Sequence, residues 1–128
     1  MREAGLMRDI QLALARAGCI LFRNNVGQYQ YSPGKYIRYG ICNPGGSDLI
    51  GWYRGRFLAV EVKTPTGKLT DPQRRFLEVV NGHGGIAFVA RSVSEAMEEL
   101  RERLSRGNTS GLQGLGSGAP EQSPRVSP

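Results

Sequence analysis

The chain has 128 residues, of which 39% are hydrophobic and 22% are charged, and its formal net charge is +6. This composition is typical of one soluble globular domain, and it excludes a membrane protein because no apolar run approaches the roughly 18 residues of a membrane-spanning helix. The two cysteines are isolated in the sequence, which argues against a disulfide framework or a zinc site. The charged N-terminus has no secretory pattern, so we expect a cytoplasmic protein.

The positive charge is concentrated in the first 93 residues, which hold thirteen basic and six acidic side chains. A basic body of this size indicates a polyanionic partner, most often nucleic acid.

The first half of the chain predicts one helix and then a series of strands and turns. Apolar residues recur at helical spacing over residues 3–17 and predict an amphipathic helix. The run CILFRN, residues 19–24, predicts a strand. Residues 25–47 contain many turn signals around one tyrosine-rich strand, YIRYGI, at residues 36–41.

The second half predicts a β-hairpin, a helix, a strand and a last helix. DLIGWY and RFLAVEVK form the hairpin, with Arg54 and Gly55 as its two-residue loop. Asp71 is the expected N-cap of a helix that ends near Asn81. GIAFVA then reads as a buried strand, and the last helix follows it.

These elements define one folded domain over residues 1–104, and their order is that of an α/β domain with a mixed sheet. Residues 105–128 are rich in Gly, Ser and Pro and lack an apolar face, so we expect a disordered tail there.

The hairpin brings two carboxylates together. A two-residue loop at Arg54-Gly55 places Asp48 opposite Glu61, on the same face of the sheet as Lys63. Leu58, Val60 and Val62 fall on the opposite face, which is the better core.

Directly opposed carboxylates repel each other and destabilise a sheet. A shared proton would relieve the repulsion, and so would a divalent cation, which prefers oxygen ligands. The neighbouring ammonium of Lys63 favours the cation, because these parts together can hydrolyse a phosphodiester. The alternative is a solvated hairpin face with a local pair between Glu61 and Lys63.

Three short motifs resemble the VRR-NUC nucleases of the PD-(D/E)XK superfamily, in particular the stand-alone phage and prophage type. They are GGSD ending at Asp48, VEVK containing Glu61 and Lys63, and PQRRF containing Gln73. The resemblance covers about residues 3–100. It implies a restriction-endonuclease-like fold, with an α-β-β-β-α-β core and a mixed sheet flanked by helices. Ser47 replaces the proline that the superfamily has before the aspartate.

The resemblance also implies roles for individual residues. Asp48 and Glu61, with the backbone carbonyl of Val62, would bind Mg²⁺ or Mn²⁺, and Lys63 would assist the attacking water. Gln73 would lie at the same site.

Two of these roles have alternatives. Gln73 shares a helical stripe with apolar residues and should point inward, but a glutamine there can also serve as a helix cap. Glu3 matches an acidic position of the family and is a candidate further metal ligand. It can equally be a charge that favours the helix dipole.

Basic and aromatic side chains form a candidate DNA-binding rim. The basic residues are Arg23, Lys35, Arg38, Arg54, Arg56, Lys68, Arg74 and Arg75. Tyr29, Tyr31, Tyr36 and Tyr39 could stack on bases or form a dimer interface. The alternative is a packed tyrosine hairpin with solvated charges. His83, in a glycine-rich turn, is expected to be a loop residue rather than a catalytic base.

The expected function is that of a Mg²⁺- or Mn²⁺-dependent DNA endonuclease. Resemblance alone suggests a homodimer that acts on branched DNA such as four-way junctions. Two alternatives remain: a non-catalytic DNA-binding module that keeps the fold, and a structural or packaging partner in a phage.

Overall fold

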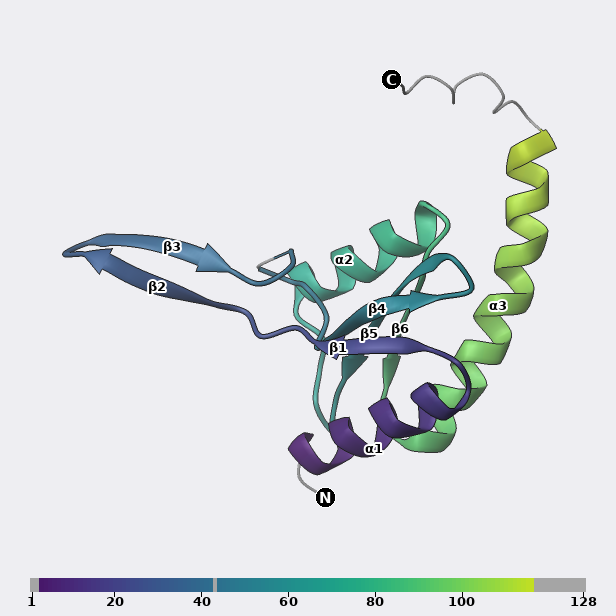
Figure 1. Cartoon of the computed structure of the whole chain (residues 1–128), viewed down its shortest axis with the longest axis horizontal. Helices are drawn as coiled ribbons and strands as arrows, with labels where there is room; N and C mark the ends of the chain where they lie inside the picture. Colours follow the sequence, from purple (N-terminus) through teal and green to yellow (C-terminus); the bar gives the residue numbers. More distant parts are fainter. Residues whose placement is uncertain (1–2, 43, 117–128) are drawn as a thin grey trace.

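The computed structural model describes the backbone of residues 3–42 and 44–116 and the side chains of residues 4–42 and 44–105. None of the described helices is long and apolar enough to cross a membrane. The elements in chain order (Figure 1) are α1 (Glu3–Arg16), β1 (Ile20–Arg23), β2 (Gly27–Ser32), β3 (Lys35–Tyr39), β4 (Leu49–Tyr53), β5 (Arg56–Val62), α2 (Asp71–Gly82), β6 (Ile86–Ala90) and α3 (Val93–Gly116).

Four strands form one mixed sheet in the order β1-β4-β5-β6. The pairs β1–β4 and β4–β5 are antiparallel, and β5–β6 is parallel. A parallel pair needs a long crossover connection, which α2 provides. With β2 and β3 set aside as an insertion, the order is α-β-β-β-α-β, which confirms the predicted restriction-endonuclease-like fold.

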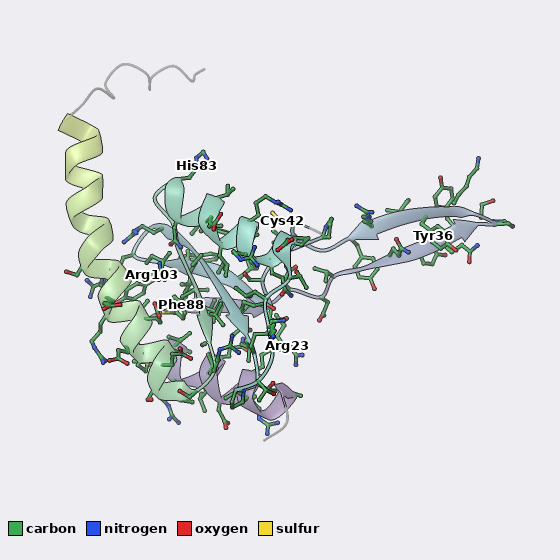
Figure 2. All side chains as sticks on the ribbon, turned by 180° about the vertical axis from the view of Figure 1, so that it is seen from behind. Arg23, Tyr36, Cys42, His83, Phe88 and Arg103 are labelled. Carbon is green, nitrogen blue, oxygen red and sulfur yellow. The ribbon has the colours of Figure 1, made fainter. Side chains whose placement is uncertain are left out.

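The sheet is covered on both faces, but unequally. α1 and α3 pack against one face and bury the larger hydrophobic cluster, which contains the predicted core residues Leu58, Val60 and Val62. Figure 2 shows Phe88 of β6 inside the body of the domain. α2 packs on the other face, over β5 and β6, and buries a smaller cluster around Ala59 and Leu77. On β1 and β4, Ile50 of this second face is buried in the smaller cluster, whereas Phe22 and Trp52 are exposed.

The β4–β5 hairpin has the predicted register. Tyr53 pairs with Arg56, and Trp52 pairs with Phe57. Arg54 and Gly55 both have positive φ, 51° and 80°, as a two-residue turn between twisted strands requires. Glycine adopts this backbone without strain, which is why the turn could be located from the sequence.

Residues 27–39 form a second, two-stranded sheet that extends away from the body (Figure 1). The prediction of a single strand over residues 36–41 was wrong, because β2 also pairs with β3. The segment packs on no buried face, and almost all of its side chains are exposed. Its strands therefore lack the apolar alternation by which a strand is recognised in a sequence.

The β2–β3 hairpin has two different faces. Tyr29 is opposite Ile37, and Gly27 is opposite Tyr39, so these residues form an apolar face. Gln28, Gln30, Tyr36 and Arg38 form the other, more polar face. The ring of Tyr39 lies over Gly27, where a Cβ atom would come within 2.7 Å of a ring carbon.

α2 begins one residue earlier than predicted. Thr70, not Asp71, is the N-cap, and its hydroxyl accepts a hydrogen bond from the backbone N–H of Gln73. The Gln73 side chain returns a bond to the Thr70 backbone, which completes a capping box. Both Thr and Asp are favourable N-caps, so residue type alone does not choose between them.

α3 is longer than the sequence suggested. A tail was predicted from residue 105, but the helix continues through residues 105–116. These residues contain no proline to break a helix. Among the residues of α3 whose side chains are described, Leu104 is the last that packs against the core. Residues 117–128 lie outside the described residues, and the division into a domain of 1–104 and a tail stays a prediction.

The two cysteines should differ sharply in reactivity. Cys19 is buried, and burial raises the pKa of its thiol to about 11, whereas Cys42 is exposed. Because the thiolate is the reactive form, we expect a thiol reagent to label Cys42 quickly and Cys19 only after denaturation. Counting fast-reacting thiols at pH 8, with Cys42→Ser as the control, tests this. Two fast thiols in the native protein would contradict it.

Candidate active site

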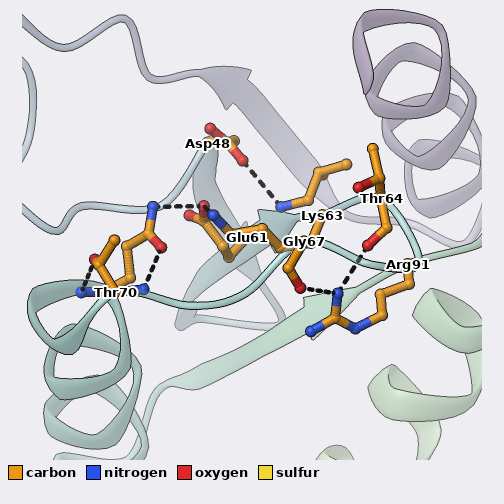
Figure 3. A network of polar contacts seen from close by, with 9 residues as sticks. Asp48, Glu61, Lys63, Thr64, Gly67, Thr70 and Arg91 are labelled. Carbon is orange, nitrogen blue, oxygen red and sulfur yellow. Dashed lines mark hydrogen bonds and ion pairs between the residues drawn. The ribbon is translucent and has the colours of Figure 1, made fainter. Parts of the chain in front are cut away.

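Asp48, Glu61 and Lys63 meet where β4 and β5 lie side by side (Figure 3). Asp48 comes immediately before β4, and the β4–β5 register continues to place it opposite Glu61. Oδ2 of Asp48 accepts a hydrogen bond of 3.0 Å from the backbone N–H of Val62. Nζ of Lys63 lies 3.7 Å from Oε2 of Glu61.

Glu61 is a buried carboxyl, with only 2% of its surface exposed. Burial raises the pKa of Glu61 to about 7, with a further contribution from the negative charge of Asp48, while Lys63 opposes the shift. Oε1 of Glu61 is buried and has no hydrogen-bond partner among the described residues. The alternative of a solvated surface pair between Glu61 and Lys63 therefore does not fit the structure.

Gln73 links α2 to the carboxylates. Its Nε2 atom donates a hydrogen bond of 3.0 Å to Oε2 of Glu61. The same side chain accepts from the backbone N–H of Thr70 through Oε1. Gln73 thus takes part in the helix cap and also contacts Glu61, and the cap fixes the amide so that its N–H points at the carboxylate. Its role in a catalytic site stays a prediction.

Arg91 holds the loop that follows Lys63. Its Nη1 atom donates to the backbone carbonyls of Thr64, at 2.8 Å, and of Gly67, at 2.6 Å. The backbone N–H of Lys63 in turn donates to the carbonyl of Ala90. These bonds could not be predicted, because a bond from a side chain to distant backbone carbonyls leaves no periodic pattern in the sequence.

Asn24 holds the other side of the site. Its Nδ2 atom donates to the carbonyls of Ile41 and Ser47, and its Oδ1 atom accepts from the backbone N–H of Ile41. Its own backbone N–H donates to the carbonyl of Asp48 at 2.8 Å. Asn24 ends the predicted strand of residues 19–24, and in the structure it joins the base of the β2–β3 hairpin to the start of β4.

The segment before Asp48 is tightly packed. A Cβ atom on Gly46 would lie 2.0 Å from the carbonyl oxygen of Ile41, and one on Gly45 would lie 2.7 Å from that of Pro72. These glycines therefore permit a close approach of backbone to backbone at the entry to β4. Ser47 is buried, and its hydroxyl has no partner among the described residues.

The eight basic residues of the predicted DNA-binding rim lie in three separate parts of the structure. Arg23, Lys68, Arg74 and Arg75 come from segments next to the carboxylates, and all four are exposed. Lys35 and Arg38 are exposed on the β2–β3 hairpin, with the four predicted tyrosines. Arg54 and Arg56 lie at the opposite end of the β4–β5 hairpin from Asp48, and Arg56 donates to the carbonyls of Gly84 and Gly85. DNA binding by these residues stays a prediction.

The sequence also suggested His83 and Glu3 as residues of interest. His83 is exposed at the end of α2 (Figure 2), as expected of a loop residue. Glu3 begins α1, but its side chain lies outside the described residues, so its role as a further metal ligand stays a prediction.

The carboxylates suit a divalent cation that has few protein ligands. No group of three or more His, Cys, Asp or Glu side chains in the described part of the chain could hold a metal. Asp48 and Glu61 supply carboxylate oxygens, including the buried Oε1 that has no partner there. Mg²⁺ is commonly held by one or two carboxylates together with substrate phosphates, so the residues present fit such an ion.

A comparison with family models identifies a known domain in the chain. The model of the VRR-NUC domain matches residues 20–94 of the chain. This span runs from β1 to the start of α3 and includes all four residues of the candidate site. A comparison with curated proteins found no match.

Proposed function

Because the chain belongs to the VRR-NUC family, a family of nuclease domains, we propose that it is a Mg²⁺- or Mn²⁺-dependent DNA endonuclease. Family membership implies nuclease-type processing of DNA. The observation that carries the finer proposal is the buried carboxyl of Glu61, which lies between Lys63 and Gln73 and faces Asp48. A buried carboxyl that is difficult to ionise destabilises the folded state. A role in binding a cation explains why the chain has a carboxyl at this position.

Each residue of the site has a distinct role in this proposal. Asp48 and Glu61 hold the ion, and when bound it supplies Lewis-acid activation of the scissile phosphate and of a water. The ammonium of Lys63 orients the attacking water and stabilises negative charge on the phosphate. Gln73 holds Oε2 of Glu61 by its hydrogen bond, so that the carboxylate keeps one orientation. Hydrolysis then leaves a 5′-phosphate and a 3′-hydroxyl.

The proposal includes the form of the protein and of its substrate. A homodimer acting on branched DNA is suggested by similar stand-alone proteins. The apolar face of the β2–β3 hairpin supports a dimer, because Tyr29 and Ile37 on that face are 64% and 56% exposed. Tyrosine is enriched at protein interfaces. Sedimentation analysis of the purified chain tests for the dimer.

A cleavage assay tests the function. Labelled four-way junction, flap, single-stranded and duplex DNA are incubated with Mg²⁺, Mn²⁺ or EDTA. We expect cleavage in both metals, none in EDTA, and fastest cleavage of the branched DNA. Asp48→Asn should abolish it, whereas Glu78→Gln, on the exposed side of α2, should not. Tight salt-sensitive binding with no cleavage of any substrate would leave a DNA-binding module and overturn the enzyme proposal.

Two variants separate the cap from the site at the start of α2. Thr70→Ala removes the cap and is expected to lower the free energy of unfolding by about 1 kcal/mol, with little effect on cleavage. Gln73→Ala keeps the bond from its backbone N–H to the Thr70 hydroxyl but removes the return bond of the capping box and the bond to Glu61, so it should also slow cleavage by roughly tenfold. Denaturant unfolding and initial cleavage rates measure the two effects. Equal loss of cleavage in both variants would show that Gln73 acts only through the helix.

A further inference from the structure

The face of the sheet that carries the carboxylates also carries three exposed aromatic rings. Phe22, Trp52 and Phe57 are 58%, 51% and 39% exposed, and we call these three residues the aromatic shelf. Trp52 is paired with Phe57 across β4 and β5. The ring centroids of Phe22 and Trp52 are 6.0 Å apart. α2 packs mainly over β5 and β6 on this face, and it leaves the three rings of the shelf exposed to solvent.

The three residues of the shelf also line an open pocket. Its volume is about 370 Å³, which is within the range of pockets that hold small ligands. Ile41 and Ile50 contribute further apolar surface to its lining. Among the described residues that line it, Arg23 is the only charged one and none is acidic. An exposed apolar surface of this kind usually marks a binding site.

The shelf and the carboxylates lie on the same two strands. Asp48 precedes Trp52 by four residues, and Glu61 follows Phe57 by four, so alternation puts all of them on one face. Four residues of a strand span roughly 14 Å. A few nucleotides of a DNA strand cover this distance. A strand with a phosphate at the carboxylates can therefore place a nearby base on the shelf.

We propose that the aromatic shelf binds unpaired nucleobases of the DNA substrate, a few nucleotides from the scissile phosphate. This inference rests on the proposed nuclease function. Aromatic side chains stack on the faces of all four bases, which gives affinity without dependence on sequence. Bases inside a duplex are already stacked on their neighbours, and freeing one requires energy. The shelf therefore favours substrates with unpaired nucleotides over intact duplex.

The fluorescence of Trp52 reports on the shelf directly, because it is the only tryptophan of the chain. The full chain is titrated in EDTA, which prevents cleavage, with a short oligothymidylate and with a duplex of equal length. We expect saturable quenching by the single strand and much weaker quenching by the duplex. Phe22→Leu, which keeps an apolar side chain but removes the ring, should weaken binding of the single strand about tenfold. Val79→Ala, an exposed change on α2, should leave it unchanged.

The outcomes distinguish the shelf from the nuclease function. The shelf proposal is wrong if the single strand does not quench the fluorescence of Trp52 and binds the Phe22→Leu variant as tightly as the wild type. If the chain nevertheless cuts DNA, the nuclease proposal stands. If binding behaves as expected but no substrate is cut, the shelf stands and the nuclease fails. If Trp52 emission instead shifts with protein concentration in the absence of DNA, and Phe22→Leu dissociates a dimer, a second copy of the chain covers the shelf and the proposal is overturned.

Discussion

Glu61→Gln is expected to reduce metal-dependent DNA cleavage by at least about a thousandfold. The substitution keeps the size of the side chain and its bond to Gln73, but it removes the charge that the proposed metal needs. Mg²⁺ or Mn²⁺ should therefore raise the melting temperature of the wild-type protein at pH 8 and leave that of Glu61→Gln nearly unchanged. Initial cleavage rates and thermal unfolding with and without metal measure the two effects.

The matched control for this substitution is Glu78→Gln, which removes one negative charge from an exposed position on α2. It should cleave DNA at the wild-type rate and show the wild-type response to metal. If the Glu61→Gln variant cleaves DNA within tenfold of the wild-type rate, Glu61 is not a metal ligand.

The metal-free protein is expected to lose stability as the pH rises from about 4.5 to about 7. The unfolded chain releases the proton of Glu61 near its ordinary pKa of 4.5, whereas the folded chain keeps it until about pH 7. The folded state binds more protons in this interval, so its stability is fully present below pH 4.5 and falls toward pH 7. The loss is up to about 3 kcal/mol, and it ends above that pH.

Comparison with Glu61→Gln isolates this contribution, because glutamine mimics the protonated carboxyl and does not titrate. In EDTA, the two proteins should have similar free energies of unfolding at pH 5, and the variant should be the more stable one at pH 8. Denaturant titrations at the two pH values measure the difference. Parallel stability profiles for the two proteins would show that the folded state does not retain this proton.

The register of the carboxylates could be predicted because two local signals agree. The Arg54-Gly55 turn fixes the pairing, and the alternation of Leu58, Val60 and Val62 fixes which face is buried. Once both are set, the side chains of Asp48 and Glu61 must share a face. The structure has this register and this core.

Other parts of the site could not be predicted, for physical reasons. Asn24 and Arg91 act through backbone carbonyls that are distant in the sequence, and nothing in residue type or spacing encodes such partners. The β2 strand buries no side chains, so it has no apolar pattern. At the start of α2, Thr70 and Asp71 are both good caps, and only the return bond from Gln73 decides between them.

The position of the β2–β3 hairpin has a consequence for how this fold can vary. β1 and β4 are antiparallel neighbours, which a short loop could connect, yet 25 residues lie between Arg23 and Leu49. The hairpin within this segment contributes no residue to either hydrophobic cluster. It can therefore be shortened, lengthened or exchanged with little effect on folding, provided that the bonds of Asn24 to Ile41 and Ser47 remain. The chain thus contains a natural grafting point, where a new recognition element can be added to an unchanged catalytic core.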